Sequence, residues 1–193
     1  MPMTDAAKLT LSPKTLETAD PRAKAILEKA KAQVGFIPNM YAGMANSPGL
    51  LQTYLDGYAS FRTYSGFTPA EQEVVFLTIS RENGCDYCMA AHSMIADKAS
   101  KVSPDVLRAI RSGASISDTK LAALNAFTSH MFATRGRPTA ASLKAFLDAG
   151  YTEAQVLEIV LALAVKTLSN YANHVNNPKV DDAFAAYAWS PKA

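Results

Sequence analysis

The chain has 193 residues, 49% of them hydrophobic, and its charge is nearly balanced, with 19 Lys+Arg against 17 Asp+Glu. This composition supplies a sizeable core and excludes an intrinsically disordered chain. The balanced charge and the lack of a basic stripe with interleaved aromatic residues argue against a nucleic-acid partner. Segment 1–12 lacks the apolar core of a signal peptide, and the longest apolar run, 159–165, is too short to span a bilayer. We therefore expect a cytoplasmic protein without membrane association.

Capping residues and glycines predict helices along almost the whole chain after an extended or loosely ordered arm at 1–19. The repeated signals are a Ser, Thr or Asp N-cap, Pro at the first helical position and Gly just past the last one. The predicted helices cover residues 21–34, 48–65, 68–83, 85–99, 104–112, 118–134, 139–148, 152–176 and 180–187. No segment alternates polar and apolar residues as a strand would. The predicted fold class is all-α, in one domain over 1–193, because no low-complexity linker divides the chain.

Two parts of the sequence resemble each other. Residues 66–68, Gly-Phe-Thr, align with residues 150–152, Gly-Tyr-Thr, and in both copies the threonine opens a capping box. In the same alignment residues 85–88, Cys-Asp-Tyr-Cys, fall on residues 169–172, Ser-Asn-Tyr-Ala. We interpret this as an internal repeat of two related helical hairpins, near 66–99 and 150–180, with pseudo-two-fold packing. Chance similarity between two capped helices is the alternative.

Cys85 and Cys88 are the two cysteines of the chain, and they lie at the predicted start of a helix. A disulfide between them would close a small loop and restrict the unfolded chain little, so a structural staple is a poor explanation. Such a pair points instead to redox, catalytic or metal chemistry. Because a helix turns by about 100° per residue, His92 lies on the same face, one turn beyond Cys88.

This helix face combines three influences that favour a reactive thiolate. A free thiol has a pKa of about 8.5, and a helix N-terminus, a cationic neighbour or Cys-x-x-Cys pairing lowers it. His92 can accept the thiol proton. The second sulfur can convert a sulfenic acid into a disulfide. Two alternatives stay open: two inert buried thiols, or zinc bound by Cys85, Cys88 and His92, for which no fourth ligand is evident because His130 and His174 are remote in the sequence.

Glu73, Cys85, Cys88 and His92 form the pattern E-x11-C-x-x-C-x3-H, which resembles the AhpD-like alkylhydroperoxidases of the carboxymuconolactone decarboxylase family. Segments 34–39, 46–51 and 170–181 also resemble the peroxidase-related branch of that family. The resemblance implies an AhpD-like helical bundle, a homo-oligomer (trimer or hexamer) and a proton relay in which Glu73 holds His92. It further implies that Cys88 meets the peroxide and Cys85 resolves it. Helix geometry leaves this order open, since thioredoxin-type logic favours Cys85.

Tyr87 is a departure from this pattern, because some members of the family have a histidine at that position. With an ordinary pKa of about 10, a tyrosine is no base near neutral pH, but it can donate a hydrogen bond or line a substrate pocket. Glu73, taken without the resemblance, would more often be a solvated charge in the first turns of a helix. Glu82 is the rival carboxylate, expected in the last turn before Gly84. The cysteine pair argues against lactone decarboxylation.

Three functions follow as hypotheses. The first is a thiol peroxidase that reduces organic hydroperoxides through a Cys85–Cys88 dithiol/disulfide cycle and is itself reduced by a dithiol or a thiol protein. No flavin, haem or nucleotide motif is visible, so we expect no cofactor and no bound metal. The second is a general thiol–disulfide oxidoreductase or redox sensor with little peroxidase activity. The third is a non-enzymatic oligomeric helical module, with a surface formed by Met40, Tyr41, Met44, Tyr54, Tyr58 and Phe61.

Overall fold

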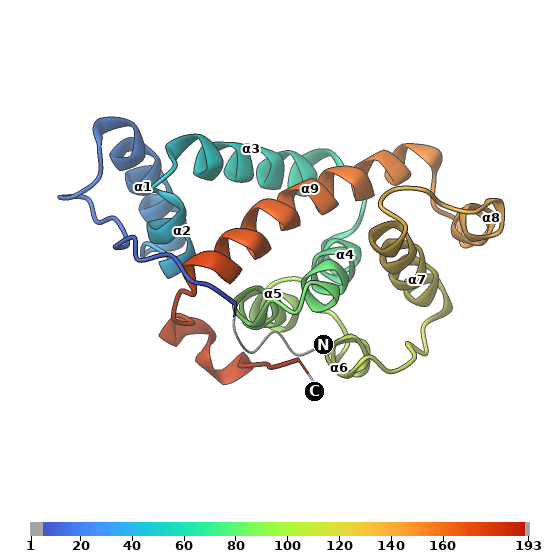
Figure 1. Cartoon of the computed structure of the whole chain (residues 1–193). Coiled ribbons are helices and arrows are strands. Elements are labelled where there is room, and N and C mark those ends of the chain that lie inside the picture. The colour runs from blue at the N-terminus through green and yellow to red at the C-terminus, as the bar shows by residue number, and fades with distance from the viewer. Residues whose placement is uncertain (1–5, 192–193) are drawn as a thin grey trace.

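The computed structural model describes residues 6–191, and these form nine α-helices, a terminal 3-10 helix and no strand (Figure 1). The helices are α1 Pro21–Val34, α2 Asn39–Met44, α3 Pro48–Tyr64, α4 Pro69–Glu82, α5 Asp86–Lys98, α6 Pro104–Ser112, α7 Thr119–Ala133, α8 Ala140–Asp148, α9 Glu153–Asn176 and η1 Asp182–Tyr187. The predicted all-α class is confirmed. The predicted arm at 1–19 has its first five residues outside the described part, and the chain is not helical from residue 6 to residue 20.

Two elements near the ends of the chain differ from the sequence expectation. Helix α2 was not predicted, because its six residues follow Pro38 without a side-chain cap and are too few to show a helical period. It matters for the site, since it carries Met40 and Tyr41. The last predicted helix, 180–187, is a 3-10 helix that begins at Asp182.

Both predicted capping boxes are formed, and they fix the starts of two helices that contribute side chains to the site. At α4, Thr68 accepts from the backbone N–H of Glu71, and the Glu71 side chain accepts from the Thr68 N–H at 2.8 Å. Thr152 and Gln155 repeat this arrangement at α9. Each box satisfies two backbone donors that would otherwise lack a partner. The internal repeat, in which α4 and α9 open two related helical hairpins, stays a prediction.

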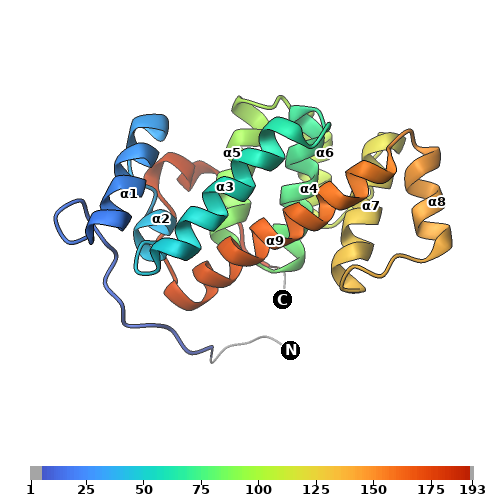
Figure 2. The ribbon, with the colours of Figure 1, turned by 90° about the horizontal axis from the view of Figure 1, so that it is seen from above.

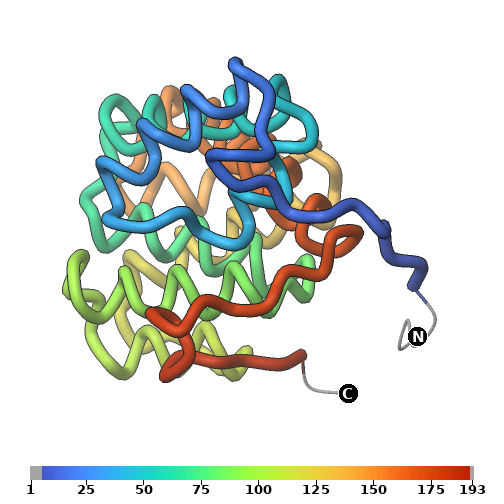
Figure 3. The backbone as a smooth tube through the Cα atoms, turned by 90° about the vertical axis from the view of Figure 1, so that its left-hand side faces the viewer, coloured from blue at the N-terminus to red at the C-terminus, as the bar shows by residue number. Residues whose placement is uncertain are grey.

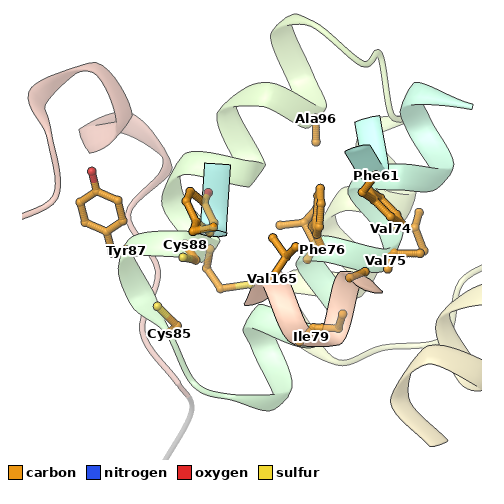
Figure 4. Packing of buried hydrophobic residues seen from close by; sticks show 14 of the residues in the cluster. Phe61, Val74, Val75, Phe76, Ile79, Cys85, Tyr87, Cys88, Ala96 and Val165 are labelled. Carbon is orange, nitrogen blue, oxygen red and sulfur yellow. The ribbon is translucent and has the colours of Figure 1, made fainter. Parts of the chain in front are cut away.

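Helix α4 is the most deeply buried element of the fold. It packs against α5, α6, α7 and α9, while α9 crosses between α3 and α4 (Figures 1 and 2). All residues from Glu71 to Ser80 are consequently buried. Phe76, Leu77 and Ile79 join the main core, part of which Figure 4 shows. Glu73 lies in the same stretch, so its carboxylate needs buried partners.

The C-terminal segment returns to the first half of the chain. After α9 ends, it runs beside α5 and α6 as η1 and the extended residues that follow (Figure 3). Arg111 in α6 donates to the carbonyl oxygens of Tyr187 and Ala188, at 3.0 and 2.9 Å. Within residues 6–191, every helix is too short or too polar to cross a membrane.

Gly57 allows α3 and α9 to approach closely, and this contact gives a stability prediction. A Cβ at Gly57 would lie 2.8 Å from Val165 Cγ2, and Val165 is itself buried. We expect Gly57→Ala to lower the free energy of unfolding by about 1–3 kcal/mol through overpacking. The control is Gly49→Ala, also in α3, where a Cβ would meet nothing within 4 Å. Urea denaturation measures both, and equal stability of the two variants would contradict the close crossing.

Candidate active site

The turn between α4 and α5 places the two cysteines at a helix N-terminus. Gly84 has a φ of 67°, a left-handed conformation that glycine adopts without strain. It reverses the chain so that Cys85 becomes the N-cap of α5, in extended geometry, and Cys88 lies in the first turn. Backbone N–H groups of a first turn have no intrahelical acceptor, so they favour negative charge near Cys88.

Both sulfur atoms are buried next to each other, and helix α9 covers them. Cys85 and Cys88 are free thiols with exposures of 0% and 2%, and Figure 4 shows their side chains together at the start of α5. Asn173 Nδ2 lies 3.5 Å from Cys85 Sγ and 3.3 Å from Cys88 Sγ, as a donor to both. Ser169 Oγ is 3.9 Å from Cys88 Sγ. The predicted second hairpin thus supplies polar contacts to the cysteines of the first.

A buried chain of polar groups runs from α3 through α4 to His92. Glu73 is 0% exposed, and its Oε2 lies 2.8 Å from His92 Nδ1. Its other oxygen accepts from Arg62 of α3, which also donates to the Tyr58 hydroxyl at 2.7 Å. The rival carboxylate, Glu82, accepts instead from Ser129 Oγ at 2.9 Å, away from the thiols. The structure therefore brings Glu73, and not Glu82, to the histidine.

The electrostatics of this chain favour an ionised Glu73 and a neutral His92. Burial alone would raise the pKa of Glu73, but His92 and Arg62 hold it below its usual value. Burial, and then the positive charge of Lys166, lower the pKa of His92 although Glu73 opposes this. With Nδ1–H donated to the carboxylate, Nε2 of His92 carries the lone pair that can take a proton.

The two thiols differ in acidity. The hydrogen bond from the Cys85 thiol, together with the positive charge of Lys166, holds the pKa of Cys88 well below its ordinary value in spite of burial. The same hydrogen bond to Cys88, followed by burial, raises the pKa of Cys85. Cys88 is therefore the sulfur that this environment prepares as a thiolate.

Sequence reasoning missed four polar residues of the site. Lys166, Ser169 and Asn173 lie on one face of α9, and Arg62 holds Glu73 from α3. One signal was visible for Lys166: it directly follows the apolar run 159–165 in a helix with buried faces, where a charge needs a reason. Arg62 gave no such signal, because its partner lies on another helix.

A cavity of about 240 Å³ opens beside Cys88 and His92. Its walls are apolar and tyrosine-rich, with contributions from Pro38, Met40, Tyr41, Tyr54, Tyr58, Tyr87, Met94 and Phe184; Cys85 is not among the lining residues. Burial raises the pKa of Tyr41, Tyr54 and Tyr58, so their hydroxyls stay protonated and can donate. The residues proposed as an external interaction surface do not form one: Met44 and Phe61 are core residues, and the others line this cavity.

Tyr87 lines the cavity and also fastens the C-terminal segment. Its hydroxyl donates to Asp181 and accepts from the backbone N–H of Met40 at 3.3 Å. Asp181 accepts in addition from the backbone N–H of Asn39 at 3.2 Å. Burial and the contact with Asp181 raise the pKa of Tyr87, which keeps it from acting as a base. In Figure 4 its ring lies on the side of α5 nearest to the C-terminal segment.

Removing the Tyr87 hydroxyl should weaken this attachment. We expect Tyr87→Phe to lower the free energy of unfolding by about 1.5–3 kcal/mol, because a nearly buried Asp181 loses a hydrogen-bond donor. Tyr171→Phe is the matched control, since the Tyr171 side chain is 54% exposed. Thermal and urea unfolding measure both variants. Identical midpoints would show that the Tyr87–Asp181 contact contributes nothing.

The zinc alternative requires a fourth ligand in addition to Cys85, Cys88 and His92. His92 Nδ1 is occupied by Glu73. Across residues 6–191, no group of three or more His, Cys, Asp and Glu side chains is arranged to hold a metal ion.

The comparisons with known proteins agree with this architecture. Residues 48–129 match the model of the carboxymuconolactone decarboxylase family, a segment that contains Glu73, both cysteines and His92. A search of the curated proteins finds no match. The fold is similar to the alkylhydroperoxidase AhpD core of an uncharacterized peroxidase-related protein from Ralstonia eutropha JMP134, with a TM-score of 0.80 and 22% identity over 94% of this chain and 97% of the other.

Two further solved structures share the fold. An uncharacterized peroxidase-related protein from Silicibacter sp. TM1040 has a TM-score of 0.74 and 17% identity over 93% of this chain and 94% of that one. A cysteine-to-alanine variant of the debrominase Bmp8, in complex with 2,3,4-tribromopyrrole, has the same TM-score and identity over 95% and 97%. The architecture is therefore the AhpD-like helical fold. The match of residues 48–129 to the carboxymuconolactone decarboxylase family model and the AhpD-like fold both agree with the resemblance that the motif indicated.

Proposed function

We propose that this protein is a thiol peroxidase that reduces organic hydroperoxides, with Cys88 as the peroxidatic and Cys85 as the resolving cysteine. The observation that carries the proposal is the position of Cys88. It lies at a helix N-terminus beside His92 and faces the tyrosine-lined cavity, whereas Cys85 does not line it. Glu73 acts in this proposal as a positioning residue, because it orients His92 and does not face the cavity.

The proposed reaction has three steps. His92 accepts the Cys88 proton, and the thiolate attacks the terminal oxygen of the hydroperoxide, so that an S–O bond forms and the O–O bond breaks. The proton passes to the departing alkoxide, which leaves as an alcohol, and Cys88 is a sulfenic acid. Cys85 then attacks Cys88, and a disulfide forms as water leaves. A dithiol or a thiol protein supplies two electrons, which break the disulfide and return Cys85 and Cys88 to their reduced forms.

The cavity supports an organic substrate in preference to hydrogen peroxide. A volume of about 240 Å³ with mainly apolar walls fits a small alkyl or aryl group, and burying that group contributes binding free energy. The protonated hydroxyls of Tyr41, Tyr54 and Tyr58 are donors available to the peroxide oxygens.

The test is rapid mixing of the fully reduced protein with cumene hydroperoxide, followed by intact-mass analysis. We expect a fast loss of two hydrogens as the disulfide forms. Cys85→Ser should stop with one added oxygen, and Cys88→Ser should not react. Full turnover in Cys88→Ser, or no reaction of the parent protein over many minutes, would contradict the proposal.

A second candidate is a general thiol–disulfide oxidoreductase with little peroxidase activity. The acidic Cys88 beside a resolving thiol supports it, since the same thiolate can attack a disulfide. The ratio of rates with cumene hydroperoxide and with a small aromatic disulfide distinguishes the two. The aromatic cavity also suggests a parallel assay, bromide release from 2,3,4-tribromopyrrole, the ligand bound by Bmp8. The single domain over 1–193 and the trimer or hexamer remain predictions.

A further inference from the structure

We propose that Lys166 is the counter-ion of the Cys88 thiolate and that it makes the Cys85–Cys88 disulfide more oxidising. This inference rests on the redox role proposed for the cysteine pair and adds a residue that determines its potential. Lys166 acts through Cys88, and the proposal does not require that it touch a substrate.

Lys166 lies on the face of α9 that covers the sulfurs. It precedes Ser169 and Asn173, which contact the thiols, by one and two helical turns. Its side chain is 0% exposed, with Nζ 5.6 Å from the centroid of the Phe76 ring. Within residues 6–191 this buried ammonium has no hydrogen-bond partner.

The charges around Lys166 leave one suitable partner. Glu73 is already paired with Arg62 and bonded to His92, and no carboxylate among the described residues forms an ion pair with Lys166. An unpaired buried ammonium is strongly unfavourable. A thiolate at Cys88 balances it, so that two cations, Arg62 and Lys166, face two anions, Glu73 and Cys88. The positive charge of Lys166 also lowers the pKa of Cys88.

Disulfide formation removes this balance. Reduction of the disulfide takes two electrons and one proton: the proton goes to Cys85, while Cys88 remains a thiolate beside Lys166. In the disulfide form Cys88 has no charge, and the ammonium is left buried without a partner. A disulfide whose reduced form is selectively stabilised is a stronger oxidant, with a higher reduction potential. Lys166 therefore favours the dithiol form of the pair.

The experiment is a redox titration of the full chain against mixtures of reduced and oxidised glutathione, with acid quenching, alkylation and intact-mass analysis. Lys166→Met replaces the ammonium with an apolar side chain of similar length. We expect its dithiol–disulfide equilibrium to move at least tenfold toward the disulfide, which corresponds to a potential about 30 mV lower. Lys29→Met, at an exposed position of α1, is the control and should match the parent protein.

A second measurement separates the charge effect from a packing effect. In the Cys88→Ser background the thiolate is absent, so Lys166→Met should raise the thermal midpoint by removing an unbalanced charge. In the parent protein, which retains the thiolate, the gain should be smaller or reversed. An unchanged potential in Lys166→Met overturns the proposal, and so does the same stability change in both backgrounds.

The titration contains no peroxide, so its outcome is independent of peroxidase activity. A shifted potential in Lys166→Met supports the counter-ion role even if cumene hydroperoxide does not react. A parent protein that forms no Cys85–Cys88 disulfide in glutathione overturns it.

Discussion

Glu73→Gln is expected to lower the free energy of unfolding by about 3–5 kcal/mol, the range for breaking a buried ion pair from one side. Glu73 is fully buried, and each of its carboxylate oxygens has a partner, Arg62 or His92. The glutamine keeps the volume but leaves the guanidinium without its counter-charge and His92 without a carboxylate acceptor. Urea denaturation of the reduced protein measures the loss.

Two variants test whether the ion pair is the cause. Glu82→Gln neutralises a partly exposed carboxylate on the same helix, and we expect a change within about 0.5 kcal/mol. Arg62→Met combined with Glu73→Gln removes both charges and should be more stable than Glu73→Gln alone. If the double variant loses the sum of the two single losses, the pair contributes no coupling and the buried ion-pair explanation is wrong.

The same network predicts the direction of the pH dependence. The pKa of His92 is lowered in the folded protein, so its contribution to stability is complete above the unfolded value of about 6.5 and is lost as the pH falls. The pKa of Glu73 is also lowered, and its contribution is lost below the unfolded value of about 4.3. The free energy of unfolding should therefore decrease from pH 7 to pH 3. In Glu73→Gln, the part of the decrease that occurs below about pH 4.3 should be absent.

Iodoacetamide at pH 7 should label Cys88 at least about 100 times faster than Cys85. An ordinary thiol with a pKa of about 8.5 is only about 3% thiolate at this pH, and the thiolate is the nucleophile. The pKa of Cys88 lies well below that value and the pKa of Cys85 above it. Cys88 also lines the cavity through which a small reagent can approach. Peptide mapping of the singly labelled, reduced protein gives the ratio.

Cys88→Ser serves as the control for this selectivity. The remaining Cys85 should stay slow, because its side chain is 0% exposed and burial still disfavours its thiolate after the hydrogen bond to Cys88 is lost. Preferential labelling of Cys85 would reverse the proposed roles and restore the thioredoxin-type order. Equal labelling of both thiols would remove the basis for assigning separate roles.

Local signals predicted most of the helices and the first half of the site. The capping boxes at Thr68 and Thr152 and the glycines that follow several of the helices depend on residues close in sequence, so they can be identified without the fold. The spacing of Cys85, Cys88 and His92 depends only on the helical period. Helix α2 was not predicted, because it is too short to show that period.

Contacts between distant elements could not be predicted in this way. Glu73 looked like an exposed charge in the first turns of a helix, but α5, α6, α7 and α9 surround α4 and bury it. Asn173 and Ser169 reach the sulfurs because α9 crosses over the start of α5, which the sequence alignment of the two hairpins did not imply. The family resemblance supplied the Glu73–His92 contact, whereas Arg62 and Lys166 required the packed structure.

The anchoring of Tyr87 to Asp181 connects the end of the chain mechanically to the redox motif. Tyr87 lies between the two cysteines in sequence, and its hydroxyl holds a segment that brings Phe184 to the wall of the cavity. A residue at this position can hold the C-terminal segment through a hydrogen bond to Asp181, or it can act as a second proton acceptor. One side chain cannot serve both purposes. The family resemblance has a histidine at this position in some members; in this chain the tyrosine holds the C-terminal segment, and the proposed mechanism assigns proton transfer to His92 alone.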